Sequence, residues 1–247
     1  MDLGLSGRTA IVCGASEGIG LGIAEALAEE GANVVLFARR RELLEREAAR
    51  LGGLAVSGDV RSTSDLERLV RAAVDAYGGI DVLVNNSGGP PRTRAVGLTA
   101  EEVTGAVELL LLSVVRLTGL CLPYLEASGR GRIVNVTSMT VKEPVDNLVL
   151  SNAVRPGVVG WAKTLSRELG PRGITVNCIA PGRIDTERIR EVAPDGPSEA
   201  FLAEIPARRL GTPREVGDVV AFLCSERASY VNGTVLQVDG GLIRSLL

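Results

Sequence analysis

The chain has 247 residues, of which 45% are hydrophobic and only 3% aromatic. Its core must therefore be aliphatic, which suits a parallel sheet whose strands are covered on both faces. The formal net charge of −3 argues against a nucleic-acid-binding protein, which would carry a basic bias. The chain contains no histidine, so it lacks the commonest general base and the commonest transition-metal ligand. We expect no metal site.

The cysteines and the N-terminus indicate the compartment. Four cysteines are widely spaced, each within an apolar run, which favours buried free thiols in a reducing compartment; they are Cys13, Cys121, Cys178 and Cys224. The N-terminus has neither the basic stretch nor the apolar core of a signal peptide. We also expect no apolar run near the roughly 20 residues that a membrane span needs. The sequence thus favours a soluble, cytoplasmic protein without membrane or nucleic-acid partners.

Short apolar runs alternate with helical patterns along the whole chain, which is typical of repeated βαβ units. A first helix is predicted from the apolar stripe of Ile19, Ile23 and Leu27, and it ends at Gly31. A second stripe begins at Leu66. The predicted strands are Thr9–Cys13, Asn33–Ala38, Leu54–Ser57, Val82–Val84, Arg132–Thr137, Thr175–Ala180 and Val235–Val238.

Two long helices are predicted near Ala100–Ala127 and Ser151–Leu169. Because no linker or repeat divides the chain, residues 1–247 are expected to form one doubly wound (Rossmann) α/β domain. Its seven-stranded parallel sheet would carry helices on both faces. The irregular, proline-containing segment 183–210 follows the sixth strand at the carboxyl edge of the sheet. We predict a substrate lid there, with a surface loop of no function as the alternative.

A glycine-rich turn follows the first predicted strand. Gly14, Gly18 and Gly20 free the backbone to turn tightly and to approach a pyrophosphate, while the next helix points its unpaired amides at the phosphates. Ser16, Glu17 and Ile19 belong to the same turn. This position in a βαβ unit predicts a nicotinamide dinucleotide site.

The end of the second strand indicates which dinucleotide binds. An NAD-binding domain places an acidic residue at this edge, on the adenine ribose. Here the strand runs into Arg39, Arg40 and Arg41, and an arginine fork pairs well with a 2′-phosphate. The sequence therefore favours NADP over NAD, although a solvated arginine run is the alternative.

Taken together, these motifs resemble the short-chain dehydrogenase/reductase family, especially its 3-oxoacyl-acyl-carrier-protein reductase-like members. The resemblance spans the whole chain and includes Asn85–Gly88, Gly131–Ser138 and Asp239–Gly241. It implies that Asp59 and Val60 flank the adenine and that Ile184 and Thr186 contact the nicotinamide amide. By resemblance the cofactor would also contact Asn86, Ser87, Gly88, Pro181 and Gly182.

The same resemblance implies a catalytic set of Asn, Ser, Tyr and Lys, and three of its four positions differ here. Ser138 matches the family's serine. Ser151 stands at the tyrosine position and Arg155 at the lysine position, in a register fixed by the following Gly160–Leu169 segment. Leu110 falls near the asparagine position. The candidate catalytic residues are therefore Ser138, Ser151 and Arg155.

These replacements affect the chemistry unequally. Arg155 keeps a positive charge and can still donate to ribose hydroxyls, so cofactor binding can survive. Ser151 is a far weaker acid than a tyrosine, whose pKa begins near ~10. A proton for carbonyl reduction would have to come from water, from the substrate or from Lys142, although an ordinary exposed lysine is the alternative for that residue.

The leading hypothesis is an NADP(H)-dependent oxidoreductase that interconverts a carbonyl and an alcohol at a divergent active site. The carbonyl would be of 3-oxoacyl type, including a carrier-bound acyl chain, or a small ketone. The alternative is a catalytically silent dinucleotide-binding protein that acts as a sensor, a scaffold or a partner subunit. Arginines could form a positive rim around the pocket, namely Arg92, Arg94, Arg183, Arg188, Arg208 and Arg209. The resemblance further implies a homotetramer.

Overall fold

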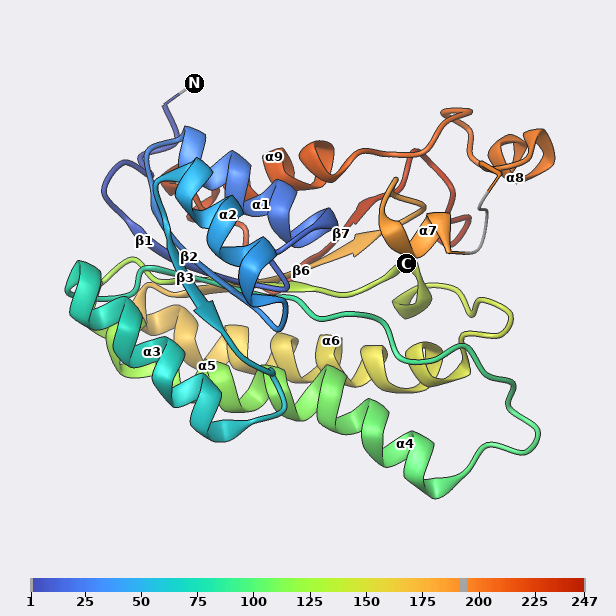
Figure 1. Cartoon of the computed structure of the whole chain (residues 1–247), viewed down its shortest axis with the longest axis horizontal. Coiled ribbons are helices and arrows are strands. Elements are labelled where there is room, and N and C mark those ends of the chain that lie inside the picture. Colours follow the sequence, from blue (N-terminus) through green and yellow to red (C-terminus); the bar gives the residue numbers. More distant parts are fainter. Residues whose placement is uncertain (1, 192–194, 247) are drawn as a thin grey trace.

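A computed structural model describes residues 2–191 and 195–246. Within these residues a single sheet of seven parallel strands has the order β3-β2-β1-β4-β5-β6-β7 (Figure 1). The predicted fold class is confirmed, and no predicted strand end is off by more than one residue. The strands are β1 (Thr9–Cys13), β2 (Asn33–Ala38), β3 (Leu54–Ser57), β4 (Val82–Asn85), β5 (Arg132–Val136), β6 (Thr175–Pro181) and β7 (Val235–Val238).

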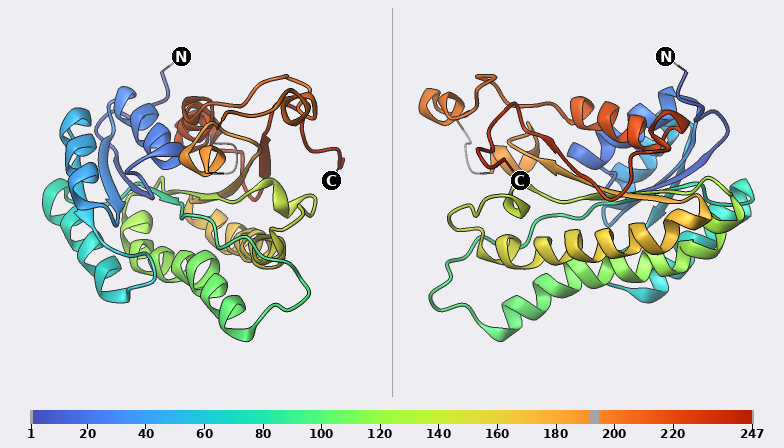
Figure 2. Two further views of the ribbon diagram at one scale, coloured as in Figure 1. Left: turned by 45° about the vertical axis from the view of Figure 1, so that its right-hand side comes forward. Right: turned by 180° about the vertical axis from the view of Figure 1, so that it is seen from behind.

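Helices cover both faces of the sheet (Figures 1 and 2). One face carries α1 (Gly18–Glu29), α2 (Arg41–Leu51) and α9 (Pro213–Cys224). The other carries α3 (Thr63–Tyr77), α5 (Ser113–Ala127) and α6 (Val149–Leu169). Alternate residues of β1 enter the two layers: Val12 packs with the first helices and Ile11 with the second. The core is therefore split by the sheet into two aliphatic layers, as the composition predicts. The sequence analysis did not identify α2 and α9.

The long helix predicted over Ala100–Ala127 is interrupted. α4 (Ala100–Val107) is followed by a π-helical turn, Glu108–Leu112, before α5 begins. The hydroxyl of Ser113 donates to the carbonyl oxygen of Leu109 across this turn, at 2.6 Å. Such turns in α-helices occur frequently at functional sites. Here the turn carries Leu110, which is buried.

The same segment corrects one expectation. Ala100–Ala127 is long enough and apolar enough, by those two measures alone, to cross a membrane, although the sequence analysis expected no such run. The buried helix of a globular core passes the same test. In this fold its inward side packs against α3 and α6.

The positions of two further helices depend on glycine. α1 and α9 cross so closely that a Cβ on Gly217 would lie 2.3 Å from the carbonyl oxygen of Gly22, and one on Gly22 would lie 2.5 Å from that of Pro213. Only glycine fits at this crossing without moving the backbone. The crossing fixes α1, whose first turn begins directly after the glycine-rich segment.

We predict that Gly217→Ala destabilises the protein by about 1–3 kcal/mol, because the added methyl group overpacks the α1–α9 crossing. Gly105→Ala in α4 is the matched control, since a Cβ there meets nothing within 4 Å. Helix propensity should make that change neutral or stabilising by up to about 1 kcal/mol. Urea denaturation of both variants measures the difference. Equal midpoints for the two variants would contradict the predicted crowding.

Candidate functional site

The loops that carry the predicted site residues meet at one edge of the sheet. All strands are parallel, and their last residues lie side by side: Cys13 pairs with Phe37, and Asn85 with Asn135. The strand order reverses between β1 and β4, because β2 and β3 lie on one side of β1 and β4 to β7 on the other. In open α/β sheets ligands bind in the crevice at this reversal.

The glycine turn between β1 and α1 has the geometry of an anion cradle. Gly14 and Gly18 have φ angles of +62° and +57°, which side chains disfavour. A Cβ on Gly20 would lie 2.1 Å from the carbonyl oxygen of Gly14, so the chain passes over itself without room for a side chain. The side chain of Asn86 donates to the carbonyl oxygen of Cys13 at 3.1 Å and secures the turn.

The start of α1 leaves backbone donors free. Glu17 precedes the helix without a capping hydrogen bond from its side chain. Within the described chain, the first backbone hydrogen bond of the helix runs from the amide of Leu21 to the carbonyl oxygen of Glu17. The amides of Gly18, Ile19 and Gly20 therefore face the turn without a hydrogen bond to the described residues. With the helix dipole they make a site for phosphate oxygens.

Arginines stand after the end of β2, next to this turn. Arg39 and Arg40 are both exposed. Arg40 forms an ion pair with Glu17 and a 3.4 Å hydrogen bond to the hydroxyl of Ser16. A hydrogen bond from Arg61 lowers the pKa of Asp59, and the charge of Arg39 adds to the effect. Arg40 therefore lies beside Ser16 of the glycine turn, and Arg39 lies near Asp59.

The loop after β6 returns to the glycine turn. Pro181 is the last residue of β6, and a Cβ on Gly182 would lie 2.6 Å from the Cβ of Asp239. Ile184 is buried and pairs with Gly211 in an isolated bridge. Thr186 lies against the glycine turn, since its Cγ2 atom is 3.2 Å from a Cβ built on Gly18.

The predicted lid, residues 183–210, contains Ile184 and Thr186 and continues with the short helices α7 (Glu187–Arg190) and α8 (Glu199–Ala203). Arg188 of α7 donates through Nη2 to the carbonyl oxygen of Pro90 at 2.9 Å. This hydrogen bond ties the segment after β6 to the loop after β4. Residues 192–194 of the predicted lid lie outside the described residues. Among the other rim arginines, Arg183 and Arg209 are paired with Glu204 and Glu215, so the rim is partly neutralised.

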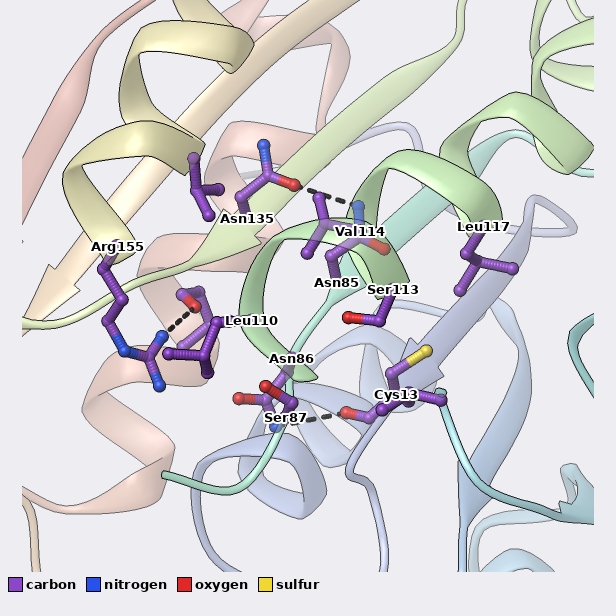
Figure 3. Close-up of a pocket in the computed structure, with 13 residues that line it drawn as sticks. Cys13, Asn85, Asn86, Ser87, Leu110, Ser113, Val114, Leu117, Asn135 and Arg155 are labelled. Carbon is purple, nitrogen blue, oxygen red and sulfur yellow. Dashed lines mark hydrogen bonds between the residues drawn. The ribbon is translucent and has the colours of Figure 1, made fainter. Parts of the chain in front are cut away.

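A pocket lies beneath these loops, between β4, β5 and the π-helical turn (Figure 3). The sequence analysis assigned five of its lining residues to positions in the cofactor or catalytic site: Val60, Asn86, Ser87, Leu110 and Arg155. The full lining is Cys13, Val60, Asn85, Asn86, Ser87, Leu110, Ser113, Val114, Leu117, Asn135, Val136, Arg155 and Val158. Ser138, Ser151 and Lys142 are not in it.

Two buried amides behind the pocket were missed as site residues. Asn85 donates through Nδ2 to Asn135 Oδ1 at 2.9 Å and to the hydroxyl of Thr118 at 3.2 Å. These residues join β4, β5 and α5 at the pocket wall. Polar residues at the ends of two otherwise apolar strands were the available signal.

Arg155, Ser151 and Thr140 form a buried polar chain. The hydroxyls of Thr140 and Ser151 lie 3.0 Å apart, and Nε of Arg155 donates to Ser151 Oγ at 3.1 Å. Nη1 of Arg155 donates to the carbonyl oxygen of Val136 at 3.1 Å. Thr140, Ser151 and Arg155 are buried, with 4%, 5% and 8% of their surface exposed, respectively. Burial lowers the pKa of Arg155 to about 10, so it is charged at neutral pH.

The other candidate groups have separate environments. Ser138 accepts a hydrogen bond from the amide of Thr140 at 3.2 Å, which leaves its hydroxyl proton free to be donated. Lys142 is half-buried rather than fully exposed. Burial raises the pKa of the Cys13 thiol at the pocket wall to about 12, so it is protonated at neutral pH. The four cysteines are buried and free, as expected.

Known proteins resemble the chain over nearly its whole length. A family model described as Enoyl-(Acyl carrier protein) reductase matches residues 14–243. The 3-oxoacyl-(acyl-carrier-protein) reductase FabG of Vibrio cholerae is 38% identical over 244 residues, which cover 97% of this chain and 99% of that protein. Dehydrogenase/reductase SDR family member 4 of Sus scrofa is 37% identical over 244 residues, 96% of this chain and 88% of that protein.

Solved structures share the architecture. L-sorbose reductase from Gluconobacter frateurii, complexed with NADPH and L-sorbose, has a TM-score of 0.94 and 34% identity, and each chain is covered completely. The NADPH-dependent reductase YwfH has a TM-score of 0.93 and 27% identity, over 97% of this chain and 99% of its own. The identities and coverage, together with the glycine turn and strand order, show that the chain belongs to the short-chain dehydrogenase/reductase family.

Proposed function

We propose that the protein is an NADP(H)-dependent oxidoreductase that interconverts a carbonyl and an alcohol at a divergent active site. The observation that carries this proposal is the glycine cradle. The backbone passes over itself at Gly14 and Gly20, and the unpaired amides of α1 point into the turn. Phosphates of a dinucleotide satisfy both features. The carbonyl substrate is of 3-oxoacyl type, including a carrier-bound acyl chain, or a small ketone.

The residues present fit NADP(H) as the cofactor. Gly14 to Gly20 would hold the pyrophosphate, and Arg39 and Arg40 the 2′-phosphate, since β2 ends in these arginines without an acid. Asp59 and Val60 would flank the adenine. Asn86, Ser87 and Gly88 would border the nicotinamide half, together with Pro181, Gly182, Ile184 and Thr186. Two of the similar solved structures are described as NADPH-bound or NADPH-dependent, which supports the same choice.

When bound, NADPH supplies the hydride for carbonyl reduction. Ser138 keeps a hydroxyl proton free and would orient the carbonyl oxygen. Arg155 places a buried positive charge at the pocket, where it would donate to ribose hydroxyls and stabilise negative charge that develops on the substrate oxygen. Ser151 accepts from Arg155 and has the high pKa of an aliphatic alcohol. The proton therefore comes from water that enters with the substrate, from the substrate itself or from Lys142.

A silent dinucleotide-binding protein is the second candidate, and the state of Ser151 favours it. Its hydroxyl is enclosed between Thr140 and Arg155, away from the pocket lining. The titratable groups in the described pocket lining are the Cys13 thiol, whose pKa burial raises to about 12, and the Arg155 guanidinium, whose pKa is about 10. Neither pKa is near neutrality. Such a chain would act as a sensor, a scaffold or a partner subunit of an active relative.

Three further features belong to the proposal. Residues 1–247 act as one Rossmann domain, and segment 183–210 is a lid over the substrate. The protein assembles as a homotetramer; the exposed Leu236 on the edge strand β7 is consistent with a neighbouring subunit at that edge. It works in the cytoplasm without nucleic-acid or membrane partners.

The cofactor preference is tested at Arg39 and Arg40. We expect Arg39→Ala or Arg40→Ala to raise the Kd for NADPH about tenfold, because each removes a charge-assisted hydrogen bond to the 2′-phosphate. The Kd for NADH should change little. Fluorescence titration of both cofactors provides the measurement, with Arg46→Ala on the outside of α2 as control. Equal weakening of NADH and NADPH would mean that these arginines do not recognise the phosphate.

The catalytic proposal is tested by restoring the family's two residues in the variant Ser151→Tyr/Arg155→Lys. NADPH consumption is compared with the native protein on a panel of 3-oxoacyl thioesters and simple ketones, after both are shown to bind NADPH. We expect native turnover of at least one panel member. We expect the variant to be faster on that substrate by up to about 10²–10⁴, the usual contribution of a general acid.

The outcomes separate the two candidate functions. A native protein that binds NADPH without turnover, beside an active variant, supports the silent protein. Native turnover that the variant does not improve identifies a proton donor other than the replaced tyrosine position, and Lys142 is then the next target. If the native protein does not bind NADPH, both the oxidoreductase and the silent dinucleotide-binding protein are overturned.

The lid is tested at Arg188. Arg188→Ala removes the hydrogen bond to Pro90 that joins the lid to the loop after β4, so we expect faster proteolytic cleavage within 183–210 and a raised KM. Arg190→Ala on the same helix is the control, since within the described residues Arg190 pairs locally, with Asp185 and Glu187. Identical cleavage rates in the two variants would show that this bond does not hold the segment.

A further inference from the structure

The glycine turn contains one carboxylate, and that carboxylate is joined to an arginine. Glu17 lies in extended backbone immediately before α1, and its side chain makes no capping hydrogen bond. Its Oε1 atom instead forms an ion pair with Nη2 of Arg40, which stands after the end of β2. The same nitrogen donates to the hydroxyl of Ser16 at 3.4 Å. Arg40 is therefore held at the edge of the cradle by two residues of the turn.

The neighbouring arginine is in a different state. Within residues 2–191 and 195–246, the side chain of Arg39 forms no hydrogen bond or ion pair. Its charge assists in lowering the pKa of Asp59, for which the hydrogen bond from Arg61 is the larger cause. A phosphate that approaches this edge can use Arg39 without breaking a contact, whereas Arg40 must first give up Glu17.

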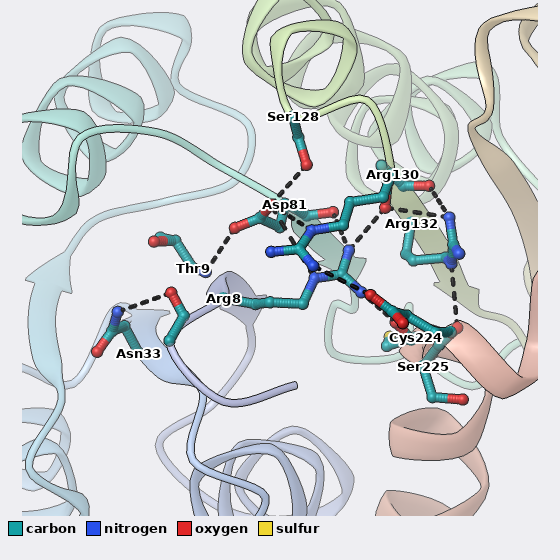
Figure 4. Close-up of polar contacts among 12 residues, drawn as sticks. Arg8, Thr9, Asn33, Asp81, Ser128, Arg130, Arg132, Cys224 and Ser225 are labelled. Atoms are coloured by element: carbon teal, nitrogen blue, oxygen red, sulfur yellow. Dashed lines mark hydrogen bonds and ion pairs between the residues drawn. The ribbon is translucent and has the colours of Figure 1, made fainter. Parts of the chain in front are cut away.

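The ion pair of Arg40 is open to solvent, unlike the arginine cluster at the amino end of the sheet (Figure 4). In that cluster Arg8 is fully buried, donates to the carbonyl oxygen of Arg130 at 2.6 Å and lies 4.0 Å from a carboxylate oxygen of Asp81. The side chains of Arg40 and Glu17 are 52% and 47% exposed. Water can solvate either charge, so this pair can open without leaving a buried ion behind.

A carboxylate at this position opposes a 2′-phosphate in two ways. It occupies a guanidinium that the phosphate would otherwise bind, and it places a like charge beside a group that carries about two negative charges at neutral pH. Rossmann domains that prefer NAD place an acid on the adenine ribose from the end of the second strand. Here β2 ends without an acid, and the acid at this edge comes from the glycine turn instead.

We propose that Glu17 is a specificity-determining residue that competes with the 2′-phosphate of NADP(H) for Arg40. The proposal rests on the proposed dinucleotide-dependent function and concerns how strongly the cofactor site prefers NADPH to NADH. When NADPH binds, Arg40 exchanges the carboxylate for the phosphate, and Glu17 turns to solvent. When NADH binds, the pair between Glu17 and Arg40 stays closed. The preference for NADPH is therefore smaller than two free arginines would produce.

The size and the sign of the effect follow from the two partners of Arg40. An exposed ion pair contributes little to stability, whereas charge-assisted hydrogen bonds to a phosphate are strong. The phosphate therefore wins the exchange, and removal of Glu17 makes the preference for NADPH a few-fold larger. If Glu17 instead held Arg40 in place for the phosphate, its removal would weaken NADPH binding. Competition and positioning thus predict changes of opposite sign.

The test measures the Kd of NADPH, NADH, adenosine 2′,5′-bisphosphate and 5′-AMP by isothermal titration calorimetry. The bisphosphate carries the 2′-phosphate without the nicotinamide half, so its binding needs no catalysis. Glu17→Gln keeps the size of the side chain and removes its charge. We expect this variant to bind NADPH and the bisphosphate about fivefold more tightly than the native protein does. The Kd values for NADH and 5′-AMP should change by less than about twofold.

A double-mutant cycle separates competition for Arg40 from a general effect of charge. In the Arg40→Ala background the gain from Glu17→Gln should fall below about twofold, because no guanidinium is left to release. Glu25→Gln is the matched control, since it breaks a partly exposed ion pair with Arg50 that lies farther along α1. That variant should bind both cofactors as the native protein does. Thermal unfolding of every variant verifies folding.

The outcomes distinguish the competition at Arg40 from the proposed function. If Glu17→Gln binds NADPH no more tightly than the native protein, or if NADH binding improves equally, the competition is overturned while the dinucleotide-dependent function stands. The same conclusion follows if the gain persists in full in the Arg40→Ala background. If neither the native protein nor Glu17→Gln binds NADPH, the proposed function and the competition are both overturned.

Discussion

The architecture depends on close backbone contact at glycine along α1. The turn before the helix needs Gly20 against the carbonyl oxygen of Gly14, and the body of the helix needs Gly22 against α9. At both positions the neighbouring backbone lies too close for a Cβ atom to fit. They fix where α1 begins and how it is oriented, and so they aim its unpaired amides at the reversal of the strand order. Without these contacts the sheet could still form, but its crevice would lack an aligned set of phosphate donors.

The consequence is a division between a cofactor half held by backbone contacts and a substrate half formed by side chains. Asn86 ties the glycine turn to the loop after β4 through the carbonyl oxygen of Cys13, and Thr186 closes against Gly18 from the loop after β6. These contacts depend on backbone geometry that a Rossmann domain must keep in order to bind its dinucleotide. Ser151, Arg155 and Leu110 lie on helices beside that frame, where side chains change without disturbing it. A chain can therefore keep the fold and the cradle while its chemistry diverges.

The sequence was sufficient for the sheet and the cradle because both leave local signals. Apolar strands and glycine spacing are visible without tertiary context, and the strand bounds differ from those predicted by a single residue at most. The π-helical turn could not be predicted, because Glu108–Leu112 continues a helical pattern and only tertiary packing selects the wider turn. The Asn85–Asn135 pair was missed since it forms between strands distant in sequence. The hydrogen bond from Arg155 to Ser151 follows helical spacing, yet the absence of a counter-ion appears only when every surrounding element is in place.

Arg155 has no counter-ion among the described residues, and this feature of the fold bears on the chemistry of the site. A family site with a phenol and an ammonium group combines an acid with a charge. Here Ser151 has an aliphatic hydroxyl in place of a phenol, while Arg155 carries a positive charge on a planar guanidinium that is held by Ser151 and by the carbonyl oxygen of Val136. The two other buried arginines of the described chain, Arg8 and Arg132, donate to backbone carbonyl oxygens, and Arg8 also lies 4.0 Å from a carboxylate oxygen of Asp81. Burying Arg155 costs free energy, and the hydrogen bonds to Ser151 and to the carbonyl oxygen of Val136 offset part of that cost before any ligand arrives. At these two positions the chain thus has a cation and a hydroxyl that are hydrogen-bonded to each other in a buried environment, so a change at either one alters the position of the other.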